Sequence, residues 1–141
     1  MVLNINYLAV LIAAIVSVII GMVWYSPVLF GKLWIKWSNF NTKMNKAQQA
    51  AHKKAAQKGM IISFFVSIIT AYILAVILSL IGSTTGPAGA QIGLLVAVGF
   101  VATTSINSVL WENKSAKVYI LNNAHHLVSF AIMGAILGAW V

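Results

Sequence analysis

Cysteine, arginine and aspartate are absent from this chain of 141 residues, and Glu112 is its only acidic residue. Without cysteine, disulfide bonds and thiolate metal sites are excluded. Only 7% of the residues are charged, whereas a soluble domain carries roughly a quarter to cover its surface. Hydrophobic residues make up 61% of the chain, and the mean hydropathy is +0.95. A lipid bilayer accommodates such a composition, so we expect an integral membrane protein.

The shortage of acidic and thiol groups also limits the chemistry of the chain. One acidic residue cannot form a paired-carboxylate site, and no cysteine can act as a nucleophile. We therefore expect no enzymatic activity and no cofactor. Adjacent histidines diverge by about 100° on a helix, so we expect no metal site unless an oligomer contributes one histidine from each subunit. The credible metal ligands are His52, His125, His126 and Glu112.

Four apolar segments are each long enough to cross about 30 Å of hydrocarbon at 1.5 Å per residue. None of them contains a charged residue in its interior, and their approximate limits are residues 5–25, 60–81, 90–111 and 118–140. The chain is therefore predicted to fold as one all-α domain, an integral membrane bundle of four transmembrane helices. No basic region precedes the first segment, so we expect it to remain in the mature protein rather than act as a cleaved signal peptide.

All nine lysines lie in two of the connections between these segments. Seven lie between the first and second segments, and Lys114 and Lys117 lie between the third and fourth. The positive-inside rule places lysine-rich loops in the cytoplasm, which predicts that both termini are outside (N-out, C-out). We expect the bacterial inner membrane as the location. This topology explains the net charge of +8, and without arginine we expect no nucleic-acid partner.

The long first connection, residues 31–58, contains a segment rich in Ala, Gln and Lys. Asn41 or Thr42 can cap a short cytoplasmic helix there, which we expect to run into the second transmembrane helix near Gly59. Its lysines could bind anionic membrane lipids at about 1 kcal/mol each, although setting the topology is the favoured role. The candidate headgroup ligands are Lys43, Lys46, Lys53, Lys54 and Lys58.

Small residues recur at four-residue spacing along the predicted helices, as close helix packing in lipid requires. The first helix carries Ala13, Ser17 and Gly21, and the fourth carries Gly134 and Gly138. Packing within the bundle explains most of this pattern. Because a bundle also leaves outward faces, we expect a homo-oligomer, with the Gly134/Gly138 stripe as the candidate contact between subunits.

Polar side chains are costly inside a membrane unless they are paired or hydrated, so they are candidates for function. Nine residues separate Lys117 from His126, which places this histidine roughly 13 Å into the membrane, near its midplane. Trp24 and Tyr25, at the cytoplasmic end of the first helix, could close the mouth of a cavity lined by these groups. The candidates on the third and fourth segments are Asn107, Glu112, Asn122, His125 and His126.

The polar residues allow more than one interpretation. In the leading one, they line a cytoplasm-facing cavity that binds or passes a small solute or ion. In the alternative, they only bond neighbouring helices, as in a structural or interaction subunit without transport. A weaker third possibility is a pH sensor, because histidine titrates near neutrality. Glu112 either pairs with a nearby lysine or tucks under the bundle, and we slightly favour the second because the adjacent Trp111 belongs at the interface.

The run GMVWYSPVLFGK at residues 21–32 is the most specific motif of the chain. It resembles the signature of a bacterial family of uncharacterised membrane proteins, the domain of unknown function 1761. The resemblance covers nearly the whole chain except the lysine-rich loop. It implies a four-helix membrane protein and no established activity, and the functional candidates that coincide with its pattern are Trp24, Tyr25, Pro27, Asn107, Glu112 and His126. Further matches are residues 6–9, Gly99-Phe100, Thr103-Thr104, His126-Leu127, Met133-Gly134 and Leu137-Gly138.

Overall fold

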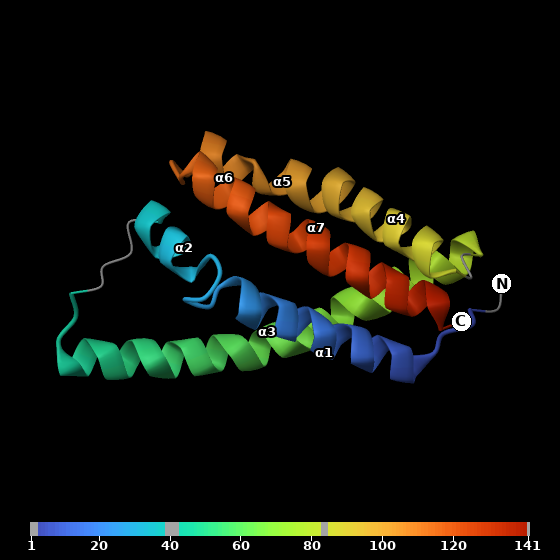
Figure 1. The fold of residues 1–141 in the computed structure, drawn as a ribbon, viewed down its shortest axis with the longest axis horizontal. Coiled ribbons are helices and arrows are strands. Elements are labelled where there is room, and N and C mark those ends of the chain that lie inside the picture. Colours follow the sequence, from blue (N-terminus) through green and yellow to red (C-terminus); the bar gives the residue numbers. More distant parts are fainter. Residues whose placement is uncertain (1–2, 39–42, 83–84, 141) are drawn as a thin grey trace.

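The computed structural model describes residues 3–38, 43–82 and 85–140, and within these ranges the chain contains helices and no β-strand (Figure 1). The predicted all-α fold is therefore confirmed. The elements are α1 (Tyr7–Trp24), α2 (Gly31–Trp37), α3 (Lys46–Ile81), α4 (Gly86–Val96), the π-helical segment η1 (Ala97–Ala102), α5 (Thr103–Ser105), α6 (Asn107–Leu110) and α7 (Ala116–Ala139).

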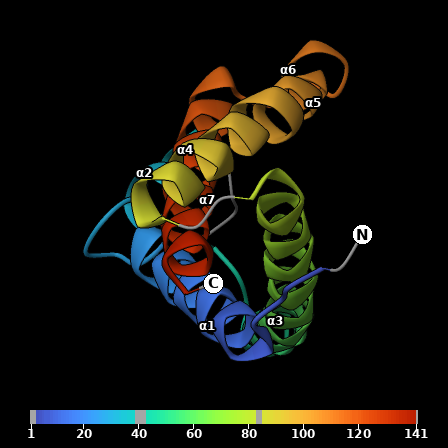
Figure 2. The ribbon, with the colours of Figure 1, turned by 90° about the vertical axis from the view of Figure 1, so that its right-hand side faces the viewer.

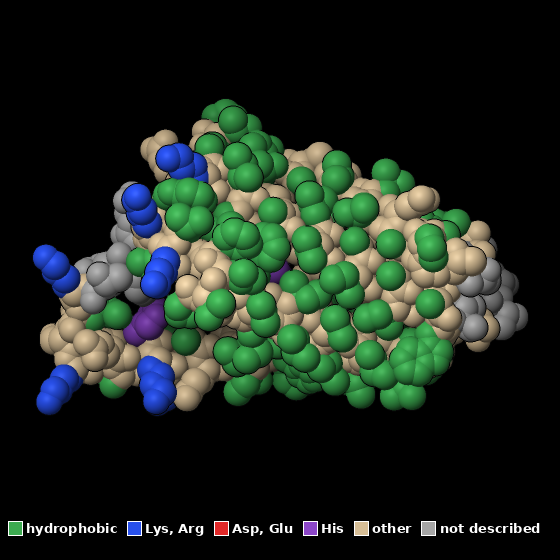
Figure 3. Space-filling model, viewed as in Figure 1, with side chains coloured by type: hydrophobic (Ala, Val, Ile, Leu, Met, Phe, Trp, Pro, Cys, Tyr) green, Lys and Arg blue, Asp and Glu red, His purple; other side chains and the backbone are tan. Residues whose placement is uncertain are grey.

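Four helical stretches in the described residues are long and apolar enough to cross a membrane, as predicted. Hydrophobic side chains cover most of the face shown in Figure 3, and the lysines gather at one end. A surface of this kind suits lipid, which solvates apolar side chains directly. The four stretches are Tyr7–Trp24, Lys46–Ile81, Gly86–Leu110 and Ala116–Ala139.

Helix α3 is a single helix of 36 residues, or about 54 Å at 1.5 Å per residue. The expected lysine-rich helix and the second apolar segment are thus one continuous element. Asn45 caps it by accepting a hydrogen bond from the Gln48 backbone N–H, while the Gln48 side chain accepts one from the Asn45 N–H. The expected caps, Asn41 and Thr42, lie outside the described residues.

Helix α7 is the centre of the bundle, with α4 packed along one side and α1 along another. Helix α3 packs mainly on α1 and barely touches α4, as the view along the bundle in Figure 2 shows. We call the end where α1 begins and α7 ends the terminal end, and the opposite end, with α2 and the start of α3, the lysine end (Figure 1). Toward the lysine end, α3 diverges from α7, so the bundle is open there.

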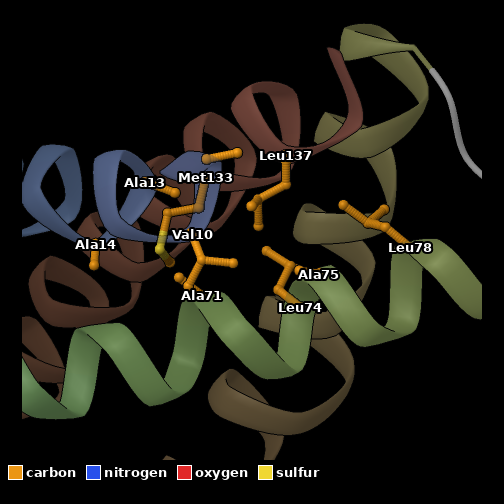
Figure 4. Packing of buried hydrophobic residues seen from close by; sticks show 10 residues of the cluster. Val10, Ala13, Ala14, Ala71, Leu74, Ala75, Leu78, Met133 and Leu137 are labelled. Carbon is orange, nitrogen blue, oxygen red and sulfur yellow. The ribbon is translucent and has the colours of Figure 1, made fainter. Parts of the chain in front are cut away.

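The buried core lies in the terminal half of the bundle, between α1, α3 and α7 (Figure 4). Alanines at four-residue spacing let α1 and α3 approach closely, and larger side chains such as Leu74 and Met133 fill the space between them. Asn6 also ties the terminal end together, because its side-chain amide donates to the Trp140 carbonyl. The core residues are Ala9, Val10, Ala13, Ala14, Ala71, Leu74, Ala75, Leu78, Met133 and Leu137.

Helices α4 and α7 meet through facing pairs of glycines. Gly134 and Gly138 are buried against Gly89 of α4, and Gly93 packs against the Phe130 carbonyl of α7. A Cβ atom on Gly134 would collide with the backbone carbonyl of Gly89. The expectation that the Gly134/Gly138 stripe joins subunits is therefore wrong, because a helix of the same chain already occupies it.

The third apolar stretch is not one regular helix. Its hydrogen bonding changes to the π pattern in η1, and Ile106 interrupts it between α5 and α6. A π segment contains an extra residue, so every later side chain is displaced by about one residue step, or 100°, around the helix. The face that packs on α7 continues from Ala97 to Ser105, and Asn107 is exposed.

Candidate functional site

The residues between α1 and α2 form a tight turn that presents Trp24 and Tyr25 to α7. The Gly31 N–H donates to the Ser26 carbonyl over 2.9 Å, and the Phe30 N–H donates to the Trp24 carbonyl over 3.0 Å. A Cβ atom on Gly31 would collide with the Tyr25 and Ser26 carbonyl oxygens, so this close approach requires glycine. The most specific sequence motif therefore fixes where the two aromatic side chains lie.

Tyr25 forms a hydrogen bond with the first half of α7. Its hydroxyl donates to Oδ1 of Asn122 over 2.7 Å. The His125 ring lies 5.3 Å from the Tyr25 ring and 6.0 Å from the Trp24 ring, measured between centroids, and 5.2 Å from the His126 ring. These five predicted candidates thus form one cluster, which we call the aromatic–histidine cluster.

His125 is held in place from two sides. Its Nε2 lies 3.3 Å from the Ser129 hydroxyl, one turn along α7. A Cβ atom on Gly21 would lie 3.3 Å from the same nitrogen, so glycine makes room for the ring against α1. Among the described residues, the buried His125 Nδ1 and Trp24 Nε1 have no hydrogen-bond partner. Buried polar atoms of this kind are normally satisfied, which marks the cluster as a place for water or a ligand.

Two adjacent clefts open beside the cluster toward the lysine end, and both are lined by Tyr25 and Ala56. The outer cleft has a volume of about 680 Å³ and the inner cleft about 520 Å³, within the usual range for small-molecule sites. The outer cleft is lined by Tyr25, Gly31, Trp34, Ile35, His52, Ala56, Asn122 and His126. The inner cleft is lined by Ser17, Val18, Gly21, Met22, Tyr25, Ala56, Met60, Ser63, Ser67 and His125.

The small-residue stripe of α1 has two roles along its length. Ala13 is fully buried in the core, as predicted for helix packing. Ser17 and Gly21, which belong to the same stripe, line the inner cleft because α3 has already diverged from α1 at their level. Ser63 and Ser67 form the opposite wall on α3. Small residues thus make room here instead of bringing helices together.

Three predicted site residues do not line these clefts, and one of them, Trp24, belongs to the aromatic–histidine cluster. Among the described residues that line the clefts, neither Asn107 nor Glu112 occurs. The Glu112 carboxylate forms an ion pair with Lys114 over 3.0 Å, with both side chains more than half exposed. The slightly favoured expectation that Glu112 tucks under the bundle is therefore wrong, and the alternative ion pair is confirmed.

Asn123 is a buried polar residue that the sequence analysis missed. Its side-chain amide donates to the Tyr119 carbonyl, and its Oδ1 accepts from the Ser105 hydroxyl over 3.2 Å. Tyr119 in turn donates its hydroxyl to the Ala102 carbonyl at the end of η1. This network joins α7 to the irregular part of the third stretch, and only the adjacent Asn122 faces the cleft. The signal for it in the sequence was the pair of consecutive asparagines, because adjacent residues on a helix point to different sides.

In the part of the chain that the structure describes, no three histidine or acidic residues are grouped so that they could hold a metal ion.

The lysines of α2 and α3 give the cleft a basic surrounding. The lysines proposed as headgroup ligands, Lys43, Lys46, Lys53, Lys54 and Lys58, are all exposed at the lysine end. Lys117 lies over the Trp37 ring at 5.7 Å and so holds α2 against the start of α7.

Four long apolar helices with a polar cluster between them define a small helical protein of the kind that suits a membrane. The sequence of residues 8–138 matches the family described as "Protein of unknown function (DUF1761)", so the chain belongs to this family. The resemblance found in the sequence is thereby confirmed. No curated protein and no solved structure matches the chain.

Proposed function

We propose that this protein lies in the bacterial inner membrane and binds a small polar solute in the two clefts at its lysine end. The observation that carries the proposal is that Tyr25, Asn122, His125 and His126 converge on these clefts from two helices. Polar groups placed in this way inside a membrane protein are typical of solute pathways and binding sites. The lining residues offer hydrogen bonds as well as aromatic surface.

The lysine distribution supports an orientation with the lysine end in the cytoplasm and both termini outside. The clefts then open to the cytoplasm, and the apolar core separates them from the opposite side. Passage of the solute requires α1, α3 and α7 to part at this core, or a homo-oligomer to supply another path. The single chain therefore supports binding more directly than it supports a channel.

The absence of cysteine makes the orientation simple to test. Gln57→Cys would place one thiol at the lysine end, and Leu3→Cys would place one at the terminal end. A membrane-impermeant maleimide added to intact bacterial cells should label Cys at position 3 and not at position 57. The reverse labelling pattern would contradict the orientation.

An alternative is a structural or interaction subunit, and the Asn123 network favours it because those polar groups are fully used between helices. Ser63→Cys on the inner cleft wall distinguishes the two proposals. If the cleft holds water and solutes, methyl methanethiosulfonate should modify this thiol quickly in nanodiscs, since the reagent needs a solvated thiolate.

Val66→Cys is the matched control, because Val66 lies on the same helix with an exposed side chain and does not line either cleft. It should react slowly in lipid. Equally slow modification at both positions would mean a sealed interior and would support the structural subunit.

A further inference from the structure

The inner and outer clefts differ in chemistry. The outer cleft combines the aromatic rings of Tyr25 and Trp34 with the polar side chains of Asn122 and His126. The inner cleft is bounded largely by apolar groups such as Val18, Met22 and Met60, with serines between them. Because Tyr25 and Ala56 line both clefts, the two clefts are adjacent, and a ligand that reaches past Tyr25 would place a polar head in the outer cleft and an apolar part in the inner cleft.

The charge around the outer cleft has one sign. Its walls include α2 and the first turns of α3, which carry Lys32, Lys36 and Lys53. The sole acidic residue of the chain, Glu112, is exposed and already paired with Lys114. A cleft surrounded by charges of one sign concentrates ligands of the opposite sign. A cationic ligand would meet no compensating carboxylate here.

The hydrogen bond between Tyr25 and Asn122 adds to this preference. The tyrosine hydroxyl donates to the Asn122 Oδ1 atom and so uses one of the two lone pairs of that oxygen. The Asn122 amide nitrogen carries two N–H donors, which remain for a ligand in the outer cleft. Donors of this kind form stronger hydrogen bonds with a charged oxygen than with a neutral one.

We infer that the ligand of these clefts is an amphipathic anion, with a phosphate or carboxylate head at Asn122 and an apolar chain or ring along α1 and α3. The inference rests on the proposed function and specifies its ligand class. A soluble organic anion and an anionic lipid share this chemistry, and both can reach a cleft that opens at the lysine end.

The test uses the full chain with Ser63→Cys in phosphatidylcholine nanodiscs. The rate of modification by uncharged methyl methanethiosulfonate is measured with octyl phosphate, octyl glucoside or octylammonium present. Octyl phosphate should protect the thiol at a concentration about tenfold lower than octyl glucoside, because its head gains charge-assisted hydrogen bonds. Octylammonium should protect least. Replacing phosphatidylcholine by phosphatidylglycerol identifies a lipid source if it also protects; otherwise the soluble source is indicated.

Two further substitutions, each combined with Ser63→Cys, test whether the stronger protection by octyl phosphate depends on the cleft. Asn122→Leu should reduce the advantage of octyl phosphate to about threefold or less, because the head loses its neutral donors. Lys53→Gln, which removes a charge next to the lining residue His52, should also weaken protection, whereas Lys114→Gln, which removes a charge from the loop between α6 and α7, should not. Equal weakening by both lysine variants would attribute the preference to general surface charge and overturn the inference.

The remaining outcomes separate this inference from the proposed function. If octyl glucoside protects as well as octyl phosphate, the clefts bind solutes and the anion assignment is wrong. If inorganic phosphate protects as well as octyl phosphate, the apolar part of the ligand is wrong. If none of the compounds protects a rapidly modified thiol, the cleft is hydrated, as the proposed function requires, but the assignment of an amphipathic anion is wrong.

Discussion

The two halves of this bundle use the same kind of residue for opposite purposes. In the terminal half, small residues of α1 meet small residues of α3, and the helices pack around the buried core. In the lysine half, Ser17 and Gly21 continue the same stripe of α1, but they face a cleft. A stripe of small residues therefore indicates where helices can approach. Small residues alone do not bring the helices together, because Ser63 and Ser67 of α3 face Ser17 and Gly21 across the cleft.

The largest effect is expected where backbones touch. Gly134→Ala would drive a Cβ atom into the Gly89 carbonyl, and α4 must move away from α7 to relieve the collision. Overpacking against a backbone should lower the free energy of unfolding by about 3 kcal/mol or more. Unfolding of the detergent-solubilised protein by added sodium dodecyl sulfate would measure the loss. An unchanged midpoint would contradict the close α4–α7 contact.

A smaller loss is expected in the core of the terminal half. Leu74 is 1% exposed, whereas the adjacent Ile73 is 50% exposed on the outer side of α3. Leu74→Ala should cost about 2 kcal/mol by leaving a cavity, while Ile73→Ala should change stability by less than about 0.5 kcal/mol. The same detergent titration compares the two variants. Similar losses at both positions would mean that the core is not where the structure places it.

The next effect concerns the contact of α7 with the third apolar stretch in the lysine half. Asn123→Leu would leave the Ser105 hydroxyl and the Tyr119 carbonyl without their side-chain partner. We expect a loss of about 1 kcal/mol, the usual scale of a hydrogen bond between membrane helices. Asn107→Leu replaces an exposed asparagine and should have little effect on stability. A larger loss from the Asn107 variant would restore the sequence prediction that this residue faces the bundle.

The smallest effect is expected in the lysine half and has the opposite sign. Gly59 lies inside α3, and a Cβ atom there would meet no other atom within 4 Å among the described residues. Gly59→Ala should stabilise the helix by about 0.5 to 1 kcal/mol, because alanine loses less conformational freedom on folding. Circular dichroism during the same titration would detect the gain. A loss of stability would indicate that this part of α3 is packed rather than open.

The sequence predicted the number and approximate limits of the apolar helices because each requires a long run without charge. It also predicted that Trp24 and Tyr25 lie near the polar residues of the fourth segment, because these groups are at matching depths, but not the hydrogen bond between Tyr25 and Asn122. It could not predict the direction of Asn107, because the π segment η1 displaces the residues after it. Nor could it predict the partner of Gly134, because lipid-facing and buried sides of these helices are similarly apolar.

The order of the helices along the chain has a consequence for biosynthesis. Met133 and Leu137 complete the core that α1 and α3 begin, yet they belong to the last helix to leave the ribosome. In the membrane proposed above, the first two long helices would wait with their core faces covered by lipid or by the insertion machinery. Only after synthesis of the final helix can the terminal half close, so a chain truncated before α7 would retain its helices and lose its tertiary structure.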